Sequence, residues 1–429
     1  MQSKLCAIQE RALRITVVAG FPPDIYGEAH YSGEVFTSLA RQFPDIKLLI
    51  LAHKNDAAPN YSEVQPNLHV KRVTHPGSRL KSSIAILTLL KEILKFRPDI
   101  VHFQGTQTPR YGGLFGEPTT LLMILLRLWG IPTVATIHSL WLPADLNNLW
   151  RQKGINPWLA RALNLYYKLN LRLISYTVGA MNLLTSGNNC QIIKEYQQVY
   201  GLRASIIYYE VHPCKFQPVS EERKKEAKAA LGLERYRIVV SVGVVRPDKG
   251  FHVLLDCAPT LLNRFPDLAI VIAWAPPKGA DREYCEGLLM RRDRLASRDR
   301  VILRFEALSD EEFSRYVDAA DIVVAPYLRS LGASGPIHHA LGRGKPVVAS
   351  AIGLNTGLDG VCLLIPPGDA SELGRALDYL LSDETAYQLY CHRALDYASR
   401  WTWDDLARWY VEQYQKLIGL RRPGQSGSA

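Results

Sequence analysis

The sequence predicts an α/β protein of two doubly wound domains, each with a parallel sheet between layers of helices. Three observations support this fold class. The chain has 429 residues, which is too long for one hydrophobic core. Short runs rich in Val and Ile alternate with helical patterns, as in parallel sheets with helical crossovers. The alternation stops once, around residues 212–232, and then starts again.

The apolar runs predict the strands in order. In the first half they cover residues 14–21, 46–53, 68–75, 100–105, 132–138, 182–187 and 205–211. In the second half they cover residues 237–243, 268–275, 301–307, 321–327, 346–350 and 361–367. Ligands of such sheets bind at the carboxyl ends of the strands, so we expect the two domains to face a central cleft.

Helical patterns lie between these strands. Residues 82–96 predict one continuous helix, because their apolar positions keep the i, i+3, i+4, i+7 spacing of a single face. Residues 119–130 form the most apolar run, but it is too short to span a bilayer and carries Arg127. We therefore expect a buried helix there.

The break around residues 212–232 contains two prolines and the start of a charged amphipathic helix. We place the first domain at 1–216 and the second at 217–400. A further helix is predicted at 401–421. The small, polar residues 422–429 predict a disordered tail.

Composition narrows the class of protein. A hydrophobic fraction of 47% and a charged fraction of 21% are typical of a globular protein. The net charge of +10 favours anionic partners such as nucleotide phosphates, a phospholipid surface or nucleic acid. We expect no nucleic acid, since no recognition motif or concentrated basic stripe is present. The seven cysteines are scattered and no secretory signal is visible, which predicts a cytoplasmic protein with reduced thiols and no metal.

Residues 334–344 predict a short helix at the cleft. Ser334 can cap it, Pro336 suits its first turn and Gly344 ends it. Because helix N-termini bind anions, the amides of Gly335, Pro336 and Ile337 mark a candidate phosphate site, with the proline supplying only its fixed backbone. The alternative is a buried packing helix that Ser334 simply caps.

The stretch VSVGVVRPDKGFHVLLD (240–256) carries a second candidate phosphate site. A strand ends at Gly243, and Arg246 and Lys249 follow just before Gly250 and a helix. Two cations beside a helix start can neutralise a diphosphate leaving group. The chain has no Asp-x-Asp motif to hold a metal and a diphosphate together. The alternative is a pair of solvated loop charges.

Six stretches together resemble the GT-B-fold glycosyltransferases of the family 4 type. They are residues 21–40, 134–141, 211–218, 240–256, 342–383 and 400–417. The resemblance implies a GT-B fold, with an acceptor side in the first domain and a nucleotide-sugar donor side in the second. It also implies that the helix at 401–421 crosses back to the first domain. In residues 211–218, His212 stands in place of the aspartate of the family's GVD-x3-F-x-P signature.

The resemblance also assigns roles to residues. It implies that His138, at a strand end, contacts the donor sugar or lies close to the reacting bond, and that Gly27 belongs to a turn near donor and acceptor. The alternative for His138 is a hydrogen-bonded loop histidine. The family's two glutamates, eight positions apart, are missing: Leu331 and His339 stand in their places.

The histidine pair and the missing glutamates leave several alternatives open. His339 can replace the second glutamate as the ribose acceptor, or His338 and His339 can be one packed and one exposed helical histidine. Adjacent helical residues point about 100° apart, so they are not a metal pair. The missing first glutamate indicates a divergent sugar pocket, a slow enzyme or an inactive relative that still binds nucleotide.

Residues 138–173 interleave aromatic and basic side chains. This segment can rest on an anionic membrane and meet a lipid-linked acceptor, or it can be a buried helix with a solvated basic face. The aromatic residues are Trp141, Trp150, Trp158, Tyr166 and Tyr167, and the basic ones are Arg151, Lys153, Arg161, Lys168 and Arg172.

We therefore expect a glycosyltransferase that retains the anomeric configuration and needs no metal. Its donor is a UDP- or GDP-linked sugar, and its acceptor a glycan, a lipid-linked molecule or a small molecule. We expect a cytoplasmic enzyme, peripheral at the inner membrane face. The alternatives are an inactive GT-B homologue that binds nucleotide or glycan, and another GT-B enzyme such as a nucleotide-sugar epimerase.

Overall fold

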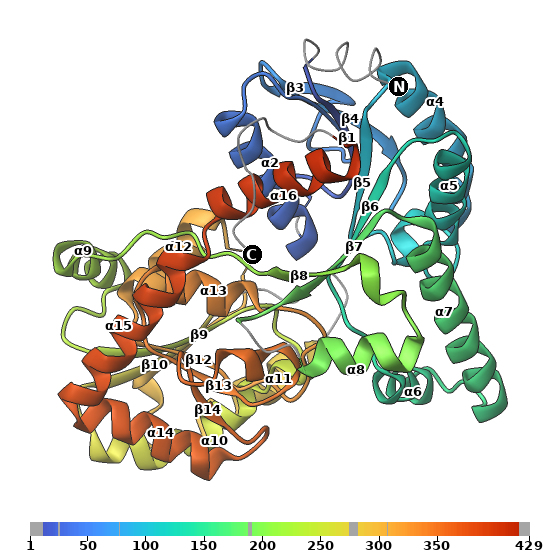
Figure 1. The fold of residues 1–429 in the computed structure, drawn as a ribbon. Coiled ribbons are helices and arrows are strands. Elements are labelled where there is room, and N and C mark those ends of the chain that lie inside the picture. The colour runs from blue at the N-terminus through green and yellow to red at the C-terminus, as the bar shows by residue number, and fades with distance from the viewer. Residues whose placement is uncertain are drawn as a thin grey trace. The chain divides into compact units, whose positions relative to one another are not determined.

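A computed structural model of the chain describes residues 12–24, 26–76, 78–187, 191–273, 282–306 and 308–419 (Figure 1). The chain divides into two compact units. The first contains residues 1–184, 191–210 and 403–429, and the second contains residues 185–190 and 211–402. The predicted tail at 422–429 lies outside the described residues.

The first unit is built around a sheet in the order β3-β4-β2-β1-β5-β6-β7-β8. Its strands are β1 (Arg14–Val18), β2 (Lys47–His53), β3 (Tyr61–Gln65), β4 (Leu68–Thr74), β5 (Ile100–Gln104), β6 (Thr133–Ile137), β7 (Ala180–Thr185) and β8 (Ile207–Val211). From β4 to β7 neighbouring strands pair in parallel, which fits the buried apolar runs of their sequences.

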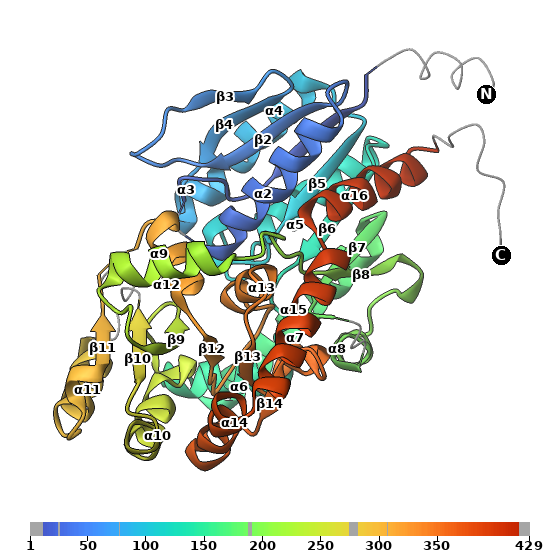
Figure 2. The same cartoon turned by 90° about the vertical axis from the view of Figure 1, so that its left-hand side faces the viewer.

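Helices cover both faces of this sheet. They are α2 (Gly27–Gln42), α3 (Arg79–Ile84), α4 (Ile86–Phe96), α5 (Glu117–Leu128), α6 (Pro143–Gln152), α7 (Pro157–Thr177), α8 (Gln191–Tyr200) and α16 (Trp403–Leu417), with short 3-10 turns at Pro109–Tyr111 and Ala204–Ile206. Figures 1 and 2 show α2 and α16 on one face and α4 and α5 on the other. The last described helix, α16, thus packs on α2, close to the start of the chain.

The second unit has a fully parallel sheet in the order β11-β10-β9-β12-β13-β14. Its strands are β9 (Arg237–Val242), β10 (Leu268–Ala273), β11 (Val301–Arg304), β12 (Ile322–Ala325), β13 (Val347–Ser350) and β14 (Leu363–Ile365). Its helices are α9 (Glu221–Leu231), α10 (Phe251–Arg264), α11 (Arg282–Asp293), α12 (Asp310–Ala319), α13 (Gly335–Gly342), α14 (Ala370–Ser382) and α15 (Glu384–Arg400), and 3-10 turns lie at η3 (Pro247–Lys249), Arg298–Arg300 and Gly353–Leu358.

Two apolar layers hold this second sheet between its helices. One layer joins it to α10, α11, α14 and the first part of α15, and the other joins it to α9, α12, α13 and the second part of α15. Alternate residues of one strand enter opposite layers: Val239 of β9 belongs to the first and Val240 to the second. This alternation follows from the two-residue period of a strand. The predicted α/β architecture of two doubly wound sheets is confirmed.

The structure corrects three sequence-based expectations. The antiparallel edge strand β3 was not predicted, because its sequence YSEVQ is polar and largely exposed. The helix predicted over 82–96 is two helices, α3 and α4, that meet at Ala85. The helix predicted as buried over 119–130 is buried on one side only: Leu121 is 52% and Leu128 75% exposed.

No helix in the described part of the chain is both long enough and apolar enough to cross a bilayer.

Candidate functional site

His138 lies at the carboxyl edge of the first unit's sheet, directly after β6, and is 8% exposed. Gln104, at the end of the neighbouring strand β5, donates its side-chain amide to His138 Nε2 at 3.0 Å. The ring of Tyr31 from α2 packs edge-on against it, with 4.7 Å between centroids. Burial lowers the pKa of His138 to about 3, so the imidazole is neutral near pH 7 and, with Nε2 accepting, carries its proton on Nδ1.

Gly27 is the first residue of α2 and is exposed. Tyr31 follows it by one helical turn, so α2 brings Gly27 into the neighbourhood of His138. Glu28, next to Gly27, places its carboxylate 3.8 Å from Arg110. Burial raises the pKa of Glu28 to about 7, and Arg110 partly opposes that rise.

Behind His138 lies a buried polar network centred on Glu210, which is 1% exposed. Tyr31 and Tyr410 donate their hydroxyls to Glu210 Oε1 at 2.6 and 2.9 Å, and Thr136 donates to Oε2 at 3.1 Å. Burial raises the pKa of Glu210 to about 7, and these hydrogen bonds oppose the rise. This network was not predicted from the sequence, where its visible signal is one acidic residue inside the strand pattern 205–211.

The network links His138 to α16 through several elements. Tyr410 OH also lies 3.4 Å from Gln104 Oε1, and Gln104 is the partner of His138. His102 connects Tyr414 OH, at 2.5 Å, with Thr136 Oγ1, at 2.9 Å. The orientation of His138 is therefore set by side chains from β5, α2 and α16.

In the second unit, Arg246 and Lys249 flank η3 but have different surroundings. Arg246 forms a two-pronged ion pair with Asp248, with distances of 2.9 Å from Nε and 2.8 Å from Nη2. Lys249 Nζ lies 3.8 Å from the centroid of the Tyr327 ring. Burial lowers the pKa of Lys249 to about 8, against the opposing effect of Asp248.

Gly250 explains why the chain turns so sharply between η3 and α10. Its φ is +66°, and a Cβ at this position would meet the carbonyl oxygen of Pro326 at 2.0 Å. A residue other than glycine would push η3 away from the end of β12. The backbone amide of Leu328 also donates to the backbone carbonyl of Asp248 at 2.9 Å, so Lys249 stays above Tyr327.

The helix predicted at 334–344 is confirmed as α13, with Ser334 at its N-cap position. Tyr327 OH lies 3.0 Å from Ser334 Oγ, which joins the ring beneath Lys249 to the start of α13. Gly335 is exposed, Pro336 is half-buried and Ile337 is buried. The structure therefore brings Lys249 and the N-terminus of α13 together.

The two histidines of α13 face different neighbours. His338 is buried, donates from Nδ1 to the Ser334 carbonyl at 2.8 Å and lies against the His212 ring, 4.2 Å between centroids. His339 is half-buried and packs edge-on against Phe313 of α12. Burial lowers the pKa of both histidines to about 4, so both rings are neutral near pH 7. Within the described residues, Nε2 of His339 is buried without a hydrogen-bond partner.

The described residues contain no group of three His, Cys, Asp or Glu side chains that could hold a metal ion. What the second unit does offer is one desolvated ammonium beside a helix N-terminus, an arrangement suited to an anion. The first unit offers a neutral imidazole with a fixed proton position and two carboxyls with raised pKa values.

Two family models match the chain. Residues 27–178 match the "Glycosyl transferase 4-like domain", and residues 236–383 match "Glycosyl transferases group 1". Together the two matched segments span more than half of the chain.

Curated relatives include two proteins named D-inositol 3-phosphate glycosyltransferase. The one from Corynebacterium urealyticum is 31% identical over 217 residues, which cover 49% of this chain and half of that protein. The one from Salinispora arenicola is 24% identical over 432 aligned residues, which cover 94% of this chain and 90% of that protein.

Solved structures share the fold. HepE from Anabaena, in complex with UDP, has a TM-score of 0.70 at 16% identity and covers 94% of this chain and all of its own. Sucrose-phosphate synthase from Thermosynechococcus elongatus has a TM-score of 0.72 at 19% identity and covers 95% of this chain and all of its own. With the matched family models, these likenesses identify the chain as a glycosyltransferase of the GT-B type that resembles family 4.

Proposed function

We propose that this glycosyltransferase takes its sugar from a UDP- or GDP-linked donor whose diphosphate binds in the second unit. The observation that carries the proposal is the position of Lys249, held over Tyr327, which is itself hydrogen-bonded to Ser334 at the start of α13. An ammonium and the exposed backbone amide of Gly335 then converge on one anion, while the Ile337 amide donates to Ser334 Oγ at 3.5 Å.

The diphosphate becomes more negative as the bond to the sugar breaks, and nearby cations stabilise that charge. Lys249 supplies one positive charge. Arg246 supplies a second when the diphosphate competes with Asp248 for its guanidinium, so we propose that transfer needs no divalent metal. HepE, whose structure was solved with UDP and with UDP-glucose, makes UDP-glucose the first donor to try.

In the first unit, we propose that His138 donates a hydrogen bond from Nδ1 to the donor sugar. Its proton position is fixed by Gln104, and its neutrality by burial. We propose transfer with retention, in which the departing diphosphate itself balances positive charge on the sugar, since Leu331 and His339 replace the family's carboxylates. His339, whose Nε2 has no hydrogen-bond partner among the residues that the structure describes, is the proposed acceptor for the donor ribose.

We propose that the acceptor is reached at a membrane surface through the exposed face of α5 and α7. Trp158 is 76% exposed, and Leu165 and Leu169 follow it at helical spacing on α7, both more than half exposed. The basic residues of α7 are Arg161, Lys168 and Arg172, and the helix contains no acidic residue. This combination fits an anionic bilayer. Trp150 and Tyr167 of the predicted aromatic set are instead buried and take no part.

Thermal unfolding with UDP, GDP and ADP tests the donor proposal. We expect stabilisation by UDP or GDP and slow hydrolysis of the matching sugar nucleotide, followed by transfer with an axial-to-axial anomeric outcome visible by NMR. EDTA should leave the rate unchanged. An unchanged melting temperature with every nucleotide would contradict the donor proposal. Loss of activity in EDTA would contradict the proposal that transfer needs no metal.

A further inference from the structure

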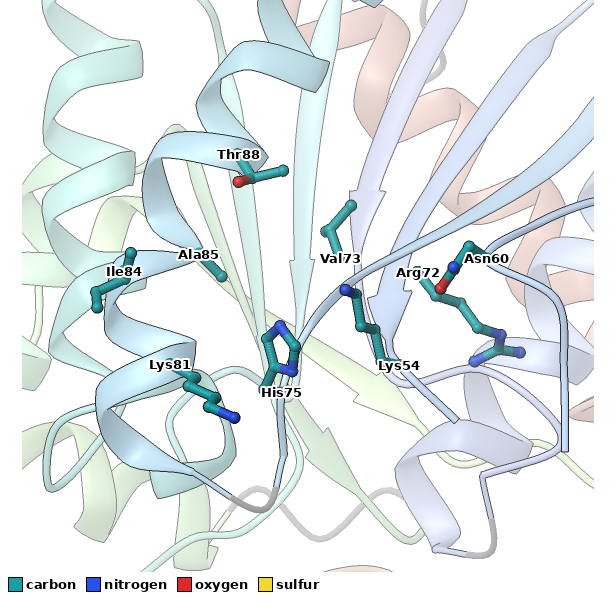
Figure 3. Close-up of a pocket in the computed structure, with 9 residues that line it drawn as sticks. All are labelled: Lys54, Asn60, Arg72, Val73, His75, Lys81, Ile84, Ala85 and Thr88. Carbon is teal, nitrogen blue, oxygen red and sulfur yellow. The ribbon is translucent and has the colours of Figure 1, made fainter. Parts of the chain in front are cut away.

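Two pockets in the described part of the chain differ in chemistry. Figure 3 shows one of about 370 Å³ in the first unit, whose titratable lining residues are all basic: Lys54, Arg72, His75 and Lys81. The other lies in the second unit and has a volume of about 600 Å³. It is a groove between η3, the first turn of α10 and α11, and both acidic and basic side chains line it.

The groove follows one face of α11. Tyr284, Gly287, Leu288 and Arg291 are spaced i, i+3, i+4 and i+7 and all line it. Leu288 is buried, whereas Arg291 is exposed. Arg282, in the first turn of α11, lines it as well. Because an α-helix rises 1.5 Å per residue, the stretch from Arg282 to Arg291 makes the groove roughly 13 Å long.

Two hydrogen-bonded rings form the part of the groove where α10 meets α11. Tyr284 OH accepts from the backbone amide of His252 at 3.2 Å and lies 2.9 Å from Nδ1 of the same residue. The hydroxyl proton is then donated to Nδ1, which leaves the imidazole proton on Nε2 as a donor. Burial lowers the pKa of His252, with Asp256 opposing and Arg291 adding to the shift, so the ring is neutral near pH 7.

The charges beside the groove balance one another. Arg282 Nε donates to Glu286 Oε1 at 2.9 Å, and Arg291 forms an ion pair with Asp256 of α10. Glu283, which also lines the groove, adds a third carboxylate. Three carboxylates against two guanidiniums give no net positive charge, so an anion gains little here. Each guanidinium has five N–H groups, so both keep donors for an uncharged partner.

Gly287 leaves the middle of the groove open. A Cβ built at this position meets no heavy atom within 4 Å, so packing does not require a glycine there. A glycine inside a helix costs about 1 kcal/mol of stability relative to alanine. Any larger side chain at this position would occupy the space between Tyr284 and Arg291, one turn away on either side. The glycine thus keeps room for a ligand.

We propose that this groove binds a short, uncharged oligosaccharide, an inference that goes beyond the proposed function and does not depend on the donor. Sugar hydroxyls both donate and accept hydrogen bonds, which matches guanidinium and imidazole N–H groups beside the carboxylate of Glu283. The C–H groups of sugar rings pack on apolar and aromatic side chains, here Leu288 and Tyr284.

The length of the groove favours a chain of sugars over a single sugar. Roughly 13 Å between its ends along α11 is more than one pyranose ring fills. Pro247 of η3 lines the groove, whereas Arg246 and Lys249 on either side of it do not. The oligosaccharide is therefore held apart from the cations of the donor site. A glycan held here stays close to the enzyme at a raised effective concentration.

NMR titration of the full chain tests the groove. The uncharged probes are maltotetraose, cellotetraose and chitotetraose, and the anionic probe is tetragalacturonic acid. Gly287→Leu fills the groove without removing any side chain, and Gly287→Ala is the matched control, because it makes the same change of helix propensity with little added volume. Both variants should melt no lower than the wild type.

We expect the wild type to bind at least one uncharged probe, Gly287→Leu to bind it at least tenfold more weakly, and Gly287→Ala to bind it within twofold of the wild type. Equal binding by Gly287→Leu and Gly287→Ala overturns the proposal, as does no binding of any uncharged probe by the wild type. Tighter binding of tetragalacturonic acid overturns the assignment to an uncharged ligand.

UDP titrated into the same proteins separates this inference from the donor proposal. UDP should bind Gly287→Leu within twofold of the wild type, which supports a separate site when oligosaccharide binding is lost. Loss of UDP binding together with oligosaccharide binding in Gly287→Leu would overturn the separate site. Failure of UDP to bind a wild type that still binds the oligosaccharide counts against the donor proposal alone.

Discussion

Replacing Lys249 with methionine removes one positive charge from the proposed diphosphate site and keeps the apolar stem. Lys249 Nζ already lies 3.8 Å from the centroid of the Tyr327 ring, so its position needs little rearrangement when an anion arrives. A hydrogen bond to a charged group contributes about 1.5–3 kcal/mol, which predicts that UDP binds the variant roughly 10- to 150-fold more weakly.

The same substitution should not destabilise the protein. Burial lowers the pKa of Lys249 from 10.5 to about 8, so the folded chain holds the charged form less readily than the unfolded chain does. As pH falls from 10.5 to 8, this lysine gains a proton first in the unfolded state, and stability decreases. Below pH 8 the buried ammonium lowers the free energy of unfolding by a constant amount of roughly 3 kcal/mol. Lys249→Met removes it, so its melting temperature should equal or exceed that of the wild type.

The assay is titration calorimetry with UDP and GDP, together with chemical denaturation. Lys225→Met, an exposed lysine on α9 of the same unit, is the matched control. We expect weak UDP binding and undiminished stability for Lys249→Met, and no change in either for Lys225→Met. Wild-type affinity in Lys249→Met would refute the assignment of this lysine to the donor site.

The remaining predictions concern pH, the buried network and the membrane face. A bound diphosphate should raise the pKa of Lys249 above 8, so UDP affinity falls as pH rises from 8 to 10 and calorimetry in two buffers at pH 8.5 detects proton uptake; equal heats in both buffers contradict this. Burial raises the pKa of Glu210 to about 7, so the free energy of unfolding should fall by roughly 3 kcal/mol as pH rises from 4.5 to 7 and the folded chain gives up this proton last. If the unfolding free energies of wild type and Glu210→Gln change in parallel over this range, the raised pKa is contradicted. His138→Ala should lower kcat by about 10²-fold or more, whereas Tyr31→Phe, which keeps the ring contact but leaves a buried acceptor short of one donor, should cost about 1–3 kcal/mol of stability and little kcat. Trp158→Asp should reduce sedimentation with vesicles containing phosphatidylglycerol, and Leu389→Asp on α15 should not; equal sedimentation of the two argues against the α5–α7 face.

The strands of both sheets could be predicted because buried parallel strands are apolar on both faces. β5, with the sequence IVHFQ, and β9, with RIVVSV, show this in five or six residues. β3 could not be predicted in this way, since an edge strand has one neighbour and its side chains stay exposed. The one-sided burial of α5 could not be predicted either, because its leucines occur around the whole helix and the sequence alone does not tell which face is covered.

Some residues of the candidate site could likewise be predicted from the sequence, and others could not. Ser334, Pro336 and the cations Arg246 and Lys249 could be found from sequence, because caps, turns and loop charges are local features. The ion pair of Arg246 with Asp248 is local as well and was overlooked. The Glu210 network was beyond reach, since its partners Tyr31 and Tyr410 lie 179 and 200 positions away in the chain.

By itself the sequence determined the fold class, the position of nearly every strand and the helix that begins at Gly335, because each follows from residues within a few positions of one another. The tertiary structure alone decided which charges are available and which are neutralised. It placed Lys249 over Tyr327, gave Arg246 to Asp248, buried His138 against Tyr31 and gathered Lys54, His75 and Lys81 around one cavity. The physical reason is that burial and pairing depend on distances through space, which residues far apart in the chain acquire only when it folds.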